Sequence, residues 1–120
     1  MAKLVRLNEH YWPLGGYGHW CPGCKAGHEI NVDRPNSQNA RWSFDGNFTK
    51  PSFSPSINLK VNTPDMGEHY QPDIASTVCH YFIKGGQIQF LGDCSHGLRG
   101  KTIELPDIPD GHYVTCERMS

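Results

Sequence analysis

Apolar and β-branched side chains alternate with polar ones in two short runs on either side of Gly85-Gly86. A period of two is typical of β-strands, and a Gly-Gly pair readily adopts the positive φ values of a two-residue hairpin turn. The pattern therefore predicts a central hairpin within residues 77–97. With the two glycines as the loop, His80 faces Leu91 across the strands.

This register divides the side chains of the hairpin between two faces, because successive side chains of a strand point in opposite directions. One face carries Cys79, Tyr81, Ile83, Ile88, Phe90 and Cys94. The other carries Val78, His80, Phe82, Leu91 and Asp93. The register thus predicts His80 beside Asp93 on one face, and Cys79 beside Cys94 on the opposite face. A slip of one residue would break both pairings.

Shorter segments predict the remaining strands and loops. Strands are expected over residues 3–7, 27–32, 41–44, 98–106 and 112–116. Residues 48–59 contain Pro51 and Pro55, which lack a backbone donor, so this segment is expected as an edge strand or an extended loop. Loops are expected over residues 11–18 and 33–40, and a long exposed loop over residues 61–76.

Composition restricts the class of protein further. The 120 residues carry a formal net charge of −1 and include 13 glycines and nine prolines. This charge gives no electrostatic basis for binding nucleic acid or a membrane surface. No apolar run reaches the ~18 residues of a membrane span, and the first residues lack the apolar run of a signal peptide. We expect a mainly β, single-domain protein over residues 1–120, located in the cytoplasm, without nucleic acid or membrane partners.

The five cysteines indicate a metal site. An odd number in a reducing compartment, with two of them in Cys21-Pro22-Gly23-Cys24, favours metal binding over a disulfide framework. The tight turn allows two thiolates to reach one ion ~2.3 Å away and leaves backbone amides to bond the sulfurs, as in half of a zinc ribbon. A redox pair or unliganded thiols are the alternatives.

Two further ligands are needed to complete a structural zinc site. The candidates are Cys79, Cys94, His96 and His28. The hairpin register favours Cys79 with Cys94, and Cys94 with His96 is the second possibility. Neither leaves an open coordination position, so one structural zinc is expected. A catalytic zinc held by His28, His80 and His96 is a third possibility. Cys116 is expected to be a packed or free thiol.

The pair of His80 and Asp93 has the composition of a general base and the carboxylate that orients it. A serine hydroxyl becomes a nucleophile when a base within hydrogen-bond reach accepts its proton. The segment 48–59 offers Ser54 and Ser56 for this role. Ser54 is the first choice, because the adjacent proline stiffens its backbone, and Ser56 is the second. His96 is the reserve base.

These residues form an ordered set of motifs that resembles a known family. The set begins with Trp20-Cys21-Pro22-Gly23-Cys24 and His28, then Trp42, Phe44 and Gly46, then Pro51-Ser52-Phe53-Ser54-Pro55-Ser56. It continues with Cys79-His80, then Gly86, Ile88 and Phe90, then Asp93-Cys94 with His96, Leu98 and Gly100, and ends with Leu105-Pro106-Asp107. It is similar to short bacterial and phage proteins catalogued as a domain of unknown function and often mislabelled ammonia monooxygenase. The resemblance covers roughly residues 4–107. Some of these relatives are encoded beside bacterial ubiquitin-like proteins and their activating and conjugating enzymes.

The resemblance implies a zinc-stabilised serine peptidase that processes or removes a ubiquitin-like protein. Its substrate or partner would be a protein, such as the tail of a ubiquitin-like protein. A non-catalytic zinc-binding interaction module, encoded by a phage, is the alternative from another class, and a zinc-dependent hydrolase is the third. The insertion-like stretch over residues 62–72 is where this chain is expected to differ from the family.

Overall fold

The structure is a computed structural model in which residues 2–61 and 77–119 are described. The predicted loop and insertion over residues 62–76 lie outside the described residues. The described strands are β1 (Leu4–Arg6), β2 (Gly16–Cys21), β3 (Ala26–Asn31), β4 (Ser43–Phe44), β5 (Phe53–Val61), β6 (Thr77–Lys84), β7 (Gln87–Phe90), β8 (Thr102–Glu104) and β9 (Glu117–Met119). None of the described residues forms a helix, so this part of the chain holds no helix that could span a membrane. The mainly β fold class is confirmed.

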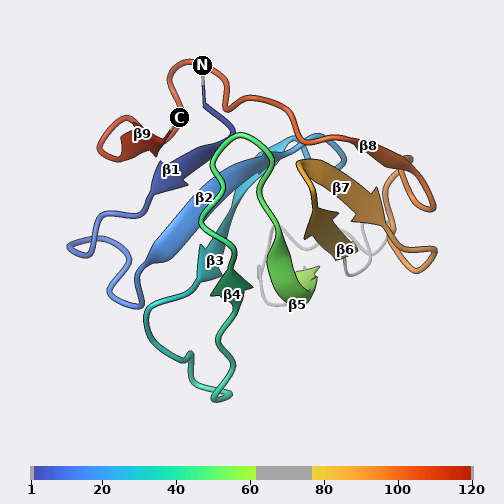
Figure 1. Cartoon of the computed structure of the whole chain (residues 1–120). Coiled ribbons are helices and arrows are strands. Elements are labelled where there is room, and N and C mark those ends of the chain that lie inside the picture. The colour runs from blue at the N-terminus through green and yellow to red at the C-terminus, as the bar shows by residue number, and fades with distance from the viewer. Residues whose placement is uncertain (1, 62–76, 120) are drawn as a thin grey trace, which may run out of the picture.

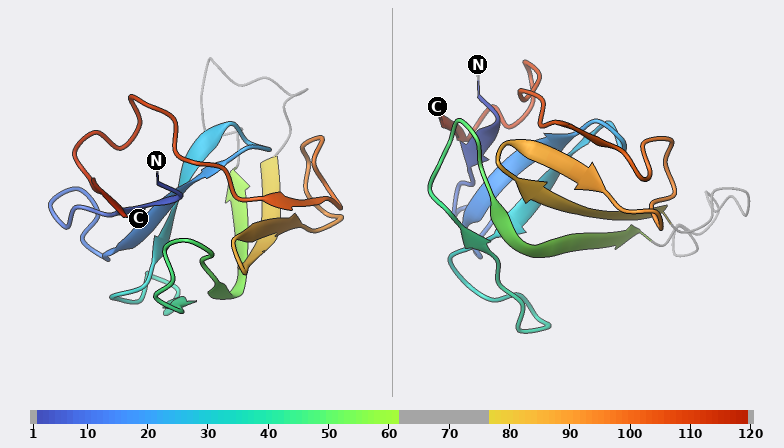
Figure 2. Two further views of the ribbon diagram at one scale, coloured as in Figure 1. Left: turned by 45° about the horizontal axis from the view of Figure 1, so that its top comes forward. Right: turned by 45° about the vertical axis from the view of Figure 1, so that its right-hand side comes forward.

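The strands form two antiparallel sheets (Figure 1). The first sheet has the order β3-β2-β1-β9, and the second has the order β4-β5-β6-β7-β8. Apolar side chains from both sheets meet in one core, with Leu4 and Ile30 from the first sheet and Phe53, Ile83 and Phe90 from the second. The two views of Figure 2 show the second sheet beside the first, with β8 and the β9 segment at opposite sides of the molecule.

The central hairpin has the predicted register. Lys84 pairs with Gln87, Ile83 with Ile88 and Tyr81 with Phe90. Gly85 and Gly86 have φ values of 57° and 81°, which is the left-handed region that this turn requires. The predicted face that carries Tyr81, Ile83, Ile88 and Phe90 is buried, and it supplies much of the core.

Several strands differ from the prediction, and β8 covers only Thr102–Glu104 of the predicted 98–106. Residues 16–18 belong to β2 rather than to a loop, because their backbone pairs with β1 on one side and with β3 on the other, which outweighs the low strand propensity of glycine. The last strand is Glu117–Met119 rather than 112–116. Its register is set by pairing with β1, with Arg118 opposite Val5.

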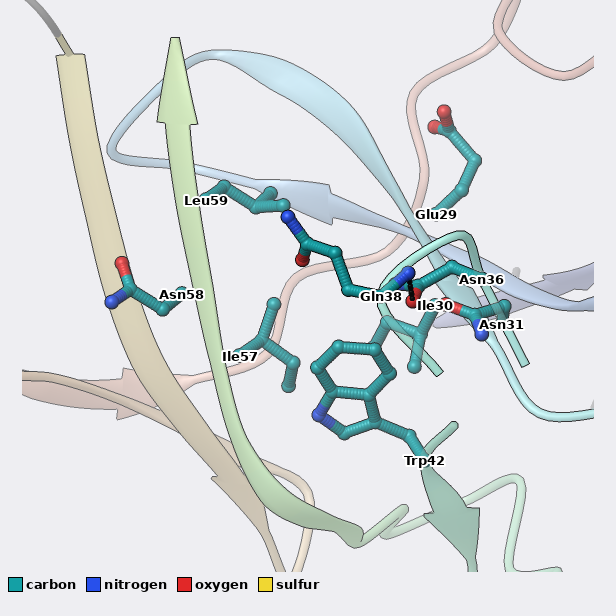
Figure 3. Close-up of a pocket in the computed structure, with 9 residues that line it drawn as sticks. All are labelled: Glu29, Ile30, Asn31, Asn36, Gln38, Trp42, Ile57, Asn58 and Leu59. Atoms are coloured by element: carbon teal, nitrogen blue, oxygen red, sulfur yellow. Dashed lines mark hydrogen bonds between the residues drawn. The ribbon is translucent and has the colours of Figure 1, made fainter. Parts of the chain in front are cut away.

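Strand β5 is not at the edge of its sheet, as its prolines predicted, but only part of it is paired on both sides. Strand β4 pairs with it at Phe53 and Ser54 alone. The pairing with β6 is interrupted between Phe53 and Ile57, and it continues to Val61. A groove lined by Trp42 and by residues of β3 and β5 lies next to this section of the strand (Figure 3).

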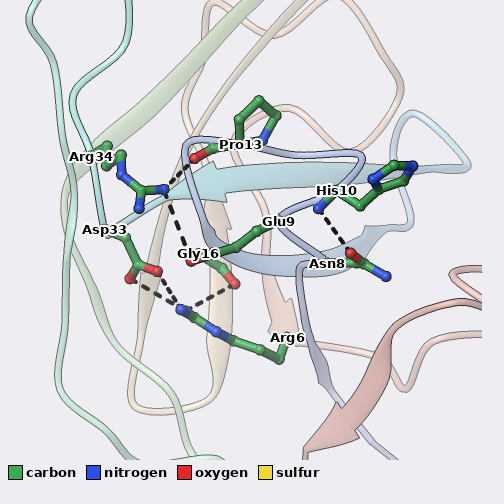
Figure 4. A network of polar contacts seen from close by, with 8 residues as sticks. All are labelled: Arg6, Asn8, Glu9, His10, Pro13, Gly16, Asp33 and Arg34. Carbon is green, nitrogen blue, oxygen red and sulfur yellow. Dashed lines mark hydrogen bonds and ion pairs between the residues drawn. The ribbon is translucent and has the colours of Figure 1, made fainter.

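A polar network fixes the start of the chain against the loop after β3 (Figure 4). Arg6 forms an ion pair with Asp33 and also donates to the carbonyl of Gly16 at 3.3 Å. Arg34 lies 3.9 Å from the carboxylate of Glu9. Burial of these groups is partial, so their main effect is to hold the loop in place rather than to add much stability.

Candidate functional site

A serine, a histidine and an aspartate form a chain of contacts on the outer face of the second sheet. The Oγ of Ser56 lies 3.1 Å from the Nε2 of His80. The Nδ1 of the same ring lies 3.1 Å from the Oδ2 of Asp93. The imidazole therefore has one nitrogen directed at a hydroxyl and the other at a carboxylate, which is the arrangement of a nucleophile, a general base and an orienting acid.

The strand register explains how these three side chains meet. His80 is directly opposite Asn58 on β5, so Ser56 is its diagonal neighbour on the same face. On the other side, the backbone amide of Leu91 donates to the carbonyl of His80 at 2.9 Å and carries the chain into the turn that holds Asp93. The side chain of His80 is 23% exposed and that of Asp93 is 56% exposed, so the site is open to solvent.

Ser54 does not lie in this chain of contacts. It is exposed and pairs with Ser43 at the start of β5. Between Phe53 and Ile57 the register of β5 against β6 shifts. This irregularity breaks the simple alternation that would have made Ser54 and Ser56 equivalent. The structure thus favours the second of the two predicted serines.

Cys94 attaches the turn that carries Asp93 to the backbone of His80. Its buried Sγ lies 3.2 Å from the backbone nitrogen of His80 and 3.1 Å from the carbonyl oxygen of the same residue. It therefore accepts a hydrogen bond from the amide and donates one to the carbonyl. These two contacts fix the backbone of the aspartate beside that of the histidine.

On the inner face of β6, four donor groups gather at one end of the core. They are the thiols of Cys21, Cys24 and Cys79 and the imidazole of His96, and the donor atoms all lie within 4.8 Å of one another. The Sγ atoms of Cys21 and Cys79 are 3.7 Å apart, and the Sγ of Cys79 is 3.5 Å from the Nε2 of His96. Ligands of a tetrahedral zinc at ~2.3 Å for sulfur and ~2.0 Å for nitrogen are spaced by about 3.8 Å and about 3.5 Å. The donor set and its spacing fit zinc.

The pKa values of the three thiols in the cluster also favour a bound metal ion. A hydrogen bond from Cys79 lowers the pKa of the Cys21 thiol to about 6. The same hydrogen bond raises the pKa of Cys79 far above its usual range, and burial raises that of Cys24 to about 11. The protein alone thus supports one negative charge here, and a divalent cation would stabilise the other thiolates.

The His96 ring is held tightly in the cluster. It meets the ring of Phe90 edge-on, with the centroids 4.6 Å apart. On the other side it packs against the backbone of Gly23, where a Cβ atom would overlap the imidazole. Gly23 is therefore required for this close approach rather than for a positive φ.

Neither predicted completion of the metal site matches this cluster, because both included Cys94. The structure pairs Cys79 with His96 instead, and the thiol of Cys94 is directed at the backbone of His80. Cys94 follows the end of β7 at Phe90, so strand alternation no longer decides where its side chain points. The three histidines of the alternative catalytic zinc are also apart: His28 contacts Tyr81, His80 contacts Ser56 and His96 lies among the thiols. Cys116 is outside the cluster as well.

His19 and His28 both contact the hydroxyl of Tyr81, next to Cys79 of the cluster. The sequence did not predict this pairing. The hydroxyl of Tyr81 lies 2.6 Å from the Nε2 of His19 and 3.1 Å from the Nδ1 of His28. Burial lowers the pKa of His19 to about 3 and that of His28 to about 4, so both rings are neutral at pH 7. The register of β2 against β3, with His19 opposite His28, explains the contact.

A comparison with protein-family models finds one family across most of the chain. Residues 3–91 match the model described as bacterial ubiquitination-like system serine protease (BubE). The chain belongs to the BubE family. The part that matches the BubE model contains Ser56, His80 and three of the four metal-cluster residues, and it ends two residues before Asp93. A search of curated proteins and a search of solved structures found no match.

Proposed function

We propose that this chain is a zinc-stabilised serine peptidase that processes or removes a ubiquitin-like protein. Ser56 is the nucleophile, His80 the general base and Asp93 the orienting carboxylate. The proposal rests on one observation, the two 3.1 Å contacts that join the three side chains in this order. Membership of a serine protease family from bacterial ubiquitination-like systems supports the substrate class.

The geometry gives each residue a defined step. The Nε2 of His80 accepts the proton of Ser56 as the Oγ attacks the carbonyl carbon of the scissile bond. The imidazolium then returns this proton to the leaving amine as the carbon–nitrogen bond breaks, which leaves an ester on Ser56. Water attacks the ester with the same base and releases the acid. Asp93 fixes the ring orientation and stabilises the imidazolium throughout.

Zinc has a structural role in this proposal. Cys21, Cys24, Cys79 and His96 would hold it, and four protein ligands leave no position for water or substrate. When bound, the metal supplies a crosslink between β2, β6 and the turn after β7. The hydrolysis is carried out by Ser56, His80 and Asp93 on the opposite face of the second sheet.

A fluorophosphonate probe tests the nucleophile directly, because it reacts with activated serines whatever the substrate. We expect the zinc-loaded protein to be labelled once, Ser56→Ala to lose labelling by more than about 100-fold, and Ser54→Ala to be labelled within about threefold of wild type. The same three proteins are then incubated with a bacterial ubiquitin-like protein that is fused at its carboxyl end to a fluorescent reporter. Only Ser56→Ala should fail to release the reporter. Equal labelling of Ser56→Ala and wild type would mean that another serine is the activated one and would contradict the proposal. No labelling of zinc-loaded wild type would favour a non-catalytic binding module.

A further inference from the structure

The groove beside β5 is bordered by two strands whose outward backbone groups have no strand partner. The groove has a volume of about 380 Å³, which is in the range of small ligand-binding sites, and Glu29 and Asn31 border it on β3 and Ile57 to Leu59 on β5. Figure 3 shows the Ile57 and Leu59 side chains on the same side of β5 as Trp42, with that of Asn58 on the other side.

The direction of the backbone groups of β5 follows from the hydrogen bonds of its neighbour. The carbonyl of His80 accepts from Leu91, so the backbone groups of His80 face β7. Asn58 is directly opposite His80, and in an antiparallel pair the backbone groups of such a residue point away from the partner strand. The amide and carbonyl of Asn58 therefore face the groove, where no described residue pairs with them.

On the opposite border of the groove, β3 also has backbone groups that face the groove without a partner among the described strands. The carbonyl of Gly16 accepts from Leu7, so Gly18, two residues on, also faces β1. Glu29 is opposite Gly18, and its backbone groups consequently point away from β2 into the groove. Within residues 2–61 and 77–119, no backbone group pairs with them either. Unpaired strand edges of this kind are templates for an added strand.

The lining of the groove indicates the chemistry of the added strand. Its apolar surface comes from Trp42, Ile57 and Leu59, and the amide of Gln38 extends across it toward Leu59 (Figure 3). Amide side chains bond peptide groups through donors and acceptors without requiring a charge. Among the described residues that line the groove, none is a lysine or arginine, and the one charged side chain is that of Glu29, whose carboxylate accepts from the Tyr113 hydroxyl. This lining argues against an anionic ligand such as a phosphate or a nucleic acid.

The groove leads to the proposed nucleophile. The indole nitrogen of Trp42 donates to the carbonyl of Ser56 at 3.1 Å, and its backbone amide donates to the carbonyl of Asn31 at 3.0 Å. Trp42 thus bonds the edges of both β3 and β5 at the end of the groove near Ser56. An added strand therefore has to leave the two edges at this point. At that point the hydroxyl of Ser56 is two residues from Asn58, on the face that carries His80.

We propose that the groove between β3 and β5 binds an extended, uncharged peptide segment of the substrate by β-strand addition, and delivers its end to Ser56. This inference rests on the proposed function, because it assigns the substrate-binding site of the same peptidase. Affinity comes from main-chain hydrogen bonds to Asn58 and Glu29, and selectivity for neutral side chains comes from the apolar and amide lining of the groove. The substrate class is therefore a flexible tail rather than a folded surface.

The test is a titration of zinc-loaded Ser56→Ala protein, which cannot cleave what it binds. The probe is a pool of acetylated 12-residue peptides of random sequence without charged residues, and binding is followed by amide NMR. We expect the signals of Glu29, Asn31 and Asn58 to shift with added peptide. In the same background, Asn58→Pro removes the groove-facing donor and should weaken apparent affinity at least tenfold, as should Glu29→Pro on the other border.

Two matched controls separate the backbone donor from other effects. Asn58→Ala keeps the amide, and Thr102→Pro makes the same kind of change in β8, which borders the far side of the sheet. Both should bind within about threefold of the parent. Shifts confined to other residues, no shift at any peptide concentration, or unchanged binding by folded Asn58→Pro and Glu29→Pro would overturn the inference. So would shifts of the same signals with protein concentration alone, since a second copy would then be the occupant. Loss of peptidase activity on its own leaves this binding result intact, so the two proposals fail separately.

Discussion

Cys79 and His80 are consecutive residues of β6 whose side chains lie on opposite faces of the same sheet. The thiol of Cys79 is 3.5 Å from the Nε2 of His96 in the metal cluster, and the ring of His80 lies between Ser56 and Asp93. One strand thus positions both sites. Because Cys79 and His80 are adjacent in the backbone, displacement of the Cys79 thiol should also displace the imidazole of His80.

Asp93→Asn tests the orienting carboxylate. An asparagine keeps the size of the side chain but does not stabilise the imidazolium of His80, so we expect kcat to fall by about 10²- to 10⁴-fold with a small change in KM. Steady-state kinetics with the reporter fusion measure the effect. Asp110→Asn, another exposed aspartate, is the control and should keep the wild-type rate. An unchanged kcat in Asp93→Asn would show that Asp93 is not the orienting carboxylate of His80.

Metal content should separate the cysteines into two groups. Wild type is expected to bind one zinc per chain, and Cys24→Ser should lose it, with a decrease in Tm of more than about 10 °C. Cys94→Ser and Cys116→Ser should keep one zinc, since both thiols lie outside the cluster. Elemental analysis and melting curves with and without a chelator measure this. A zinc-free Cys94→Ser protein would show that Cys94 is a ligand after all.

The sequence predicted the hairpin and therefore the adjacency of His80 and Asp93, because both follow from a two-glycine turn and a period of two. It did not distinguish Ser54 from Ser56. That choice depends on a register shift between Phe53 and Ile57, which is set by pairing with β6 and is not a local property.

The metal cluster was predicted in part for a similar physical reason. Cys21 and Cys24 are a local motif, whereas the choice between Cys94 and His96 depends on how the turn after β7 packs. The contact of Gly23 with the imidazole of His96 follows from the fold, because the two residues are far apart in the sequence. The groove between β3 and β5 is formed by two different sheets, so no single segment of the sequence predicts it.

Acid should destabilise the protein partly through His28. Burial lowers its pKa to about 4 in the folded protein, below the ~6.5 of an unfolded chain. Between these values the unfolded chain binds the additional proton, so the free energy of unfolding decreases as the pH falls. In His28→Asn, the loss of stability from pH 7 to pH 5 should be smaller than in wild type by about 2 kcal/mol. Urea unfolding at both pH values measures it, with exposed His10→Asn as the control that should behave as wild type.

Tyr81→Phe should lower the free energy of unfolding by about 1–3 kcal/mol, because it removes the hydroxyl from two largely buried histidine nitrogens. Tyr11→Phe changes a tyrosine that is 60% exposed and should have no measurable effect. Urea unfolding at pH 7 compares the two variants. Equal stability of Tyr81→Phe and wild type would mean that water or another group satisfies both histidines.

The contact between Gly23 and the ring of His96 also has a consequence for sequence comparison. Any side chain at position 23 would overlap the imidazole, although position 23 itself contributes no donor atom. Among chains with this fold, replacement of this glycine should therefore occur together with replacement of the histidine. In a survey of aligned relatives, position 23 could thus identify the chains in which another residue replaces His96.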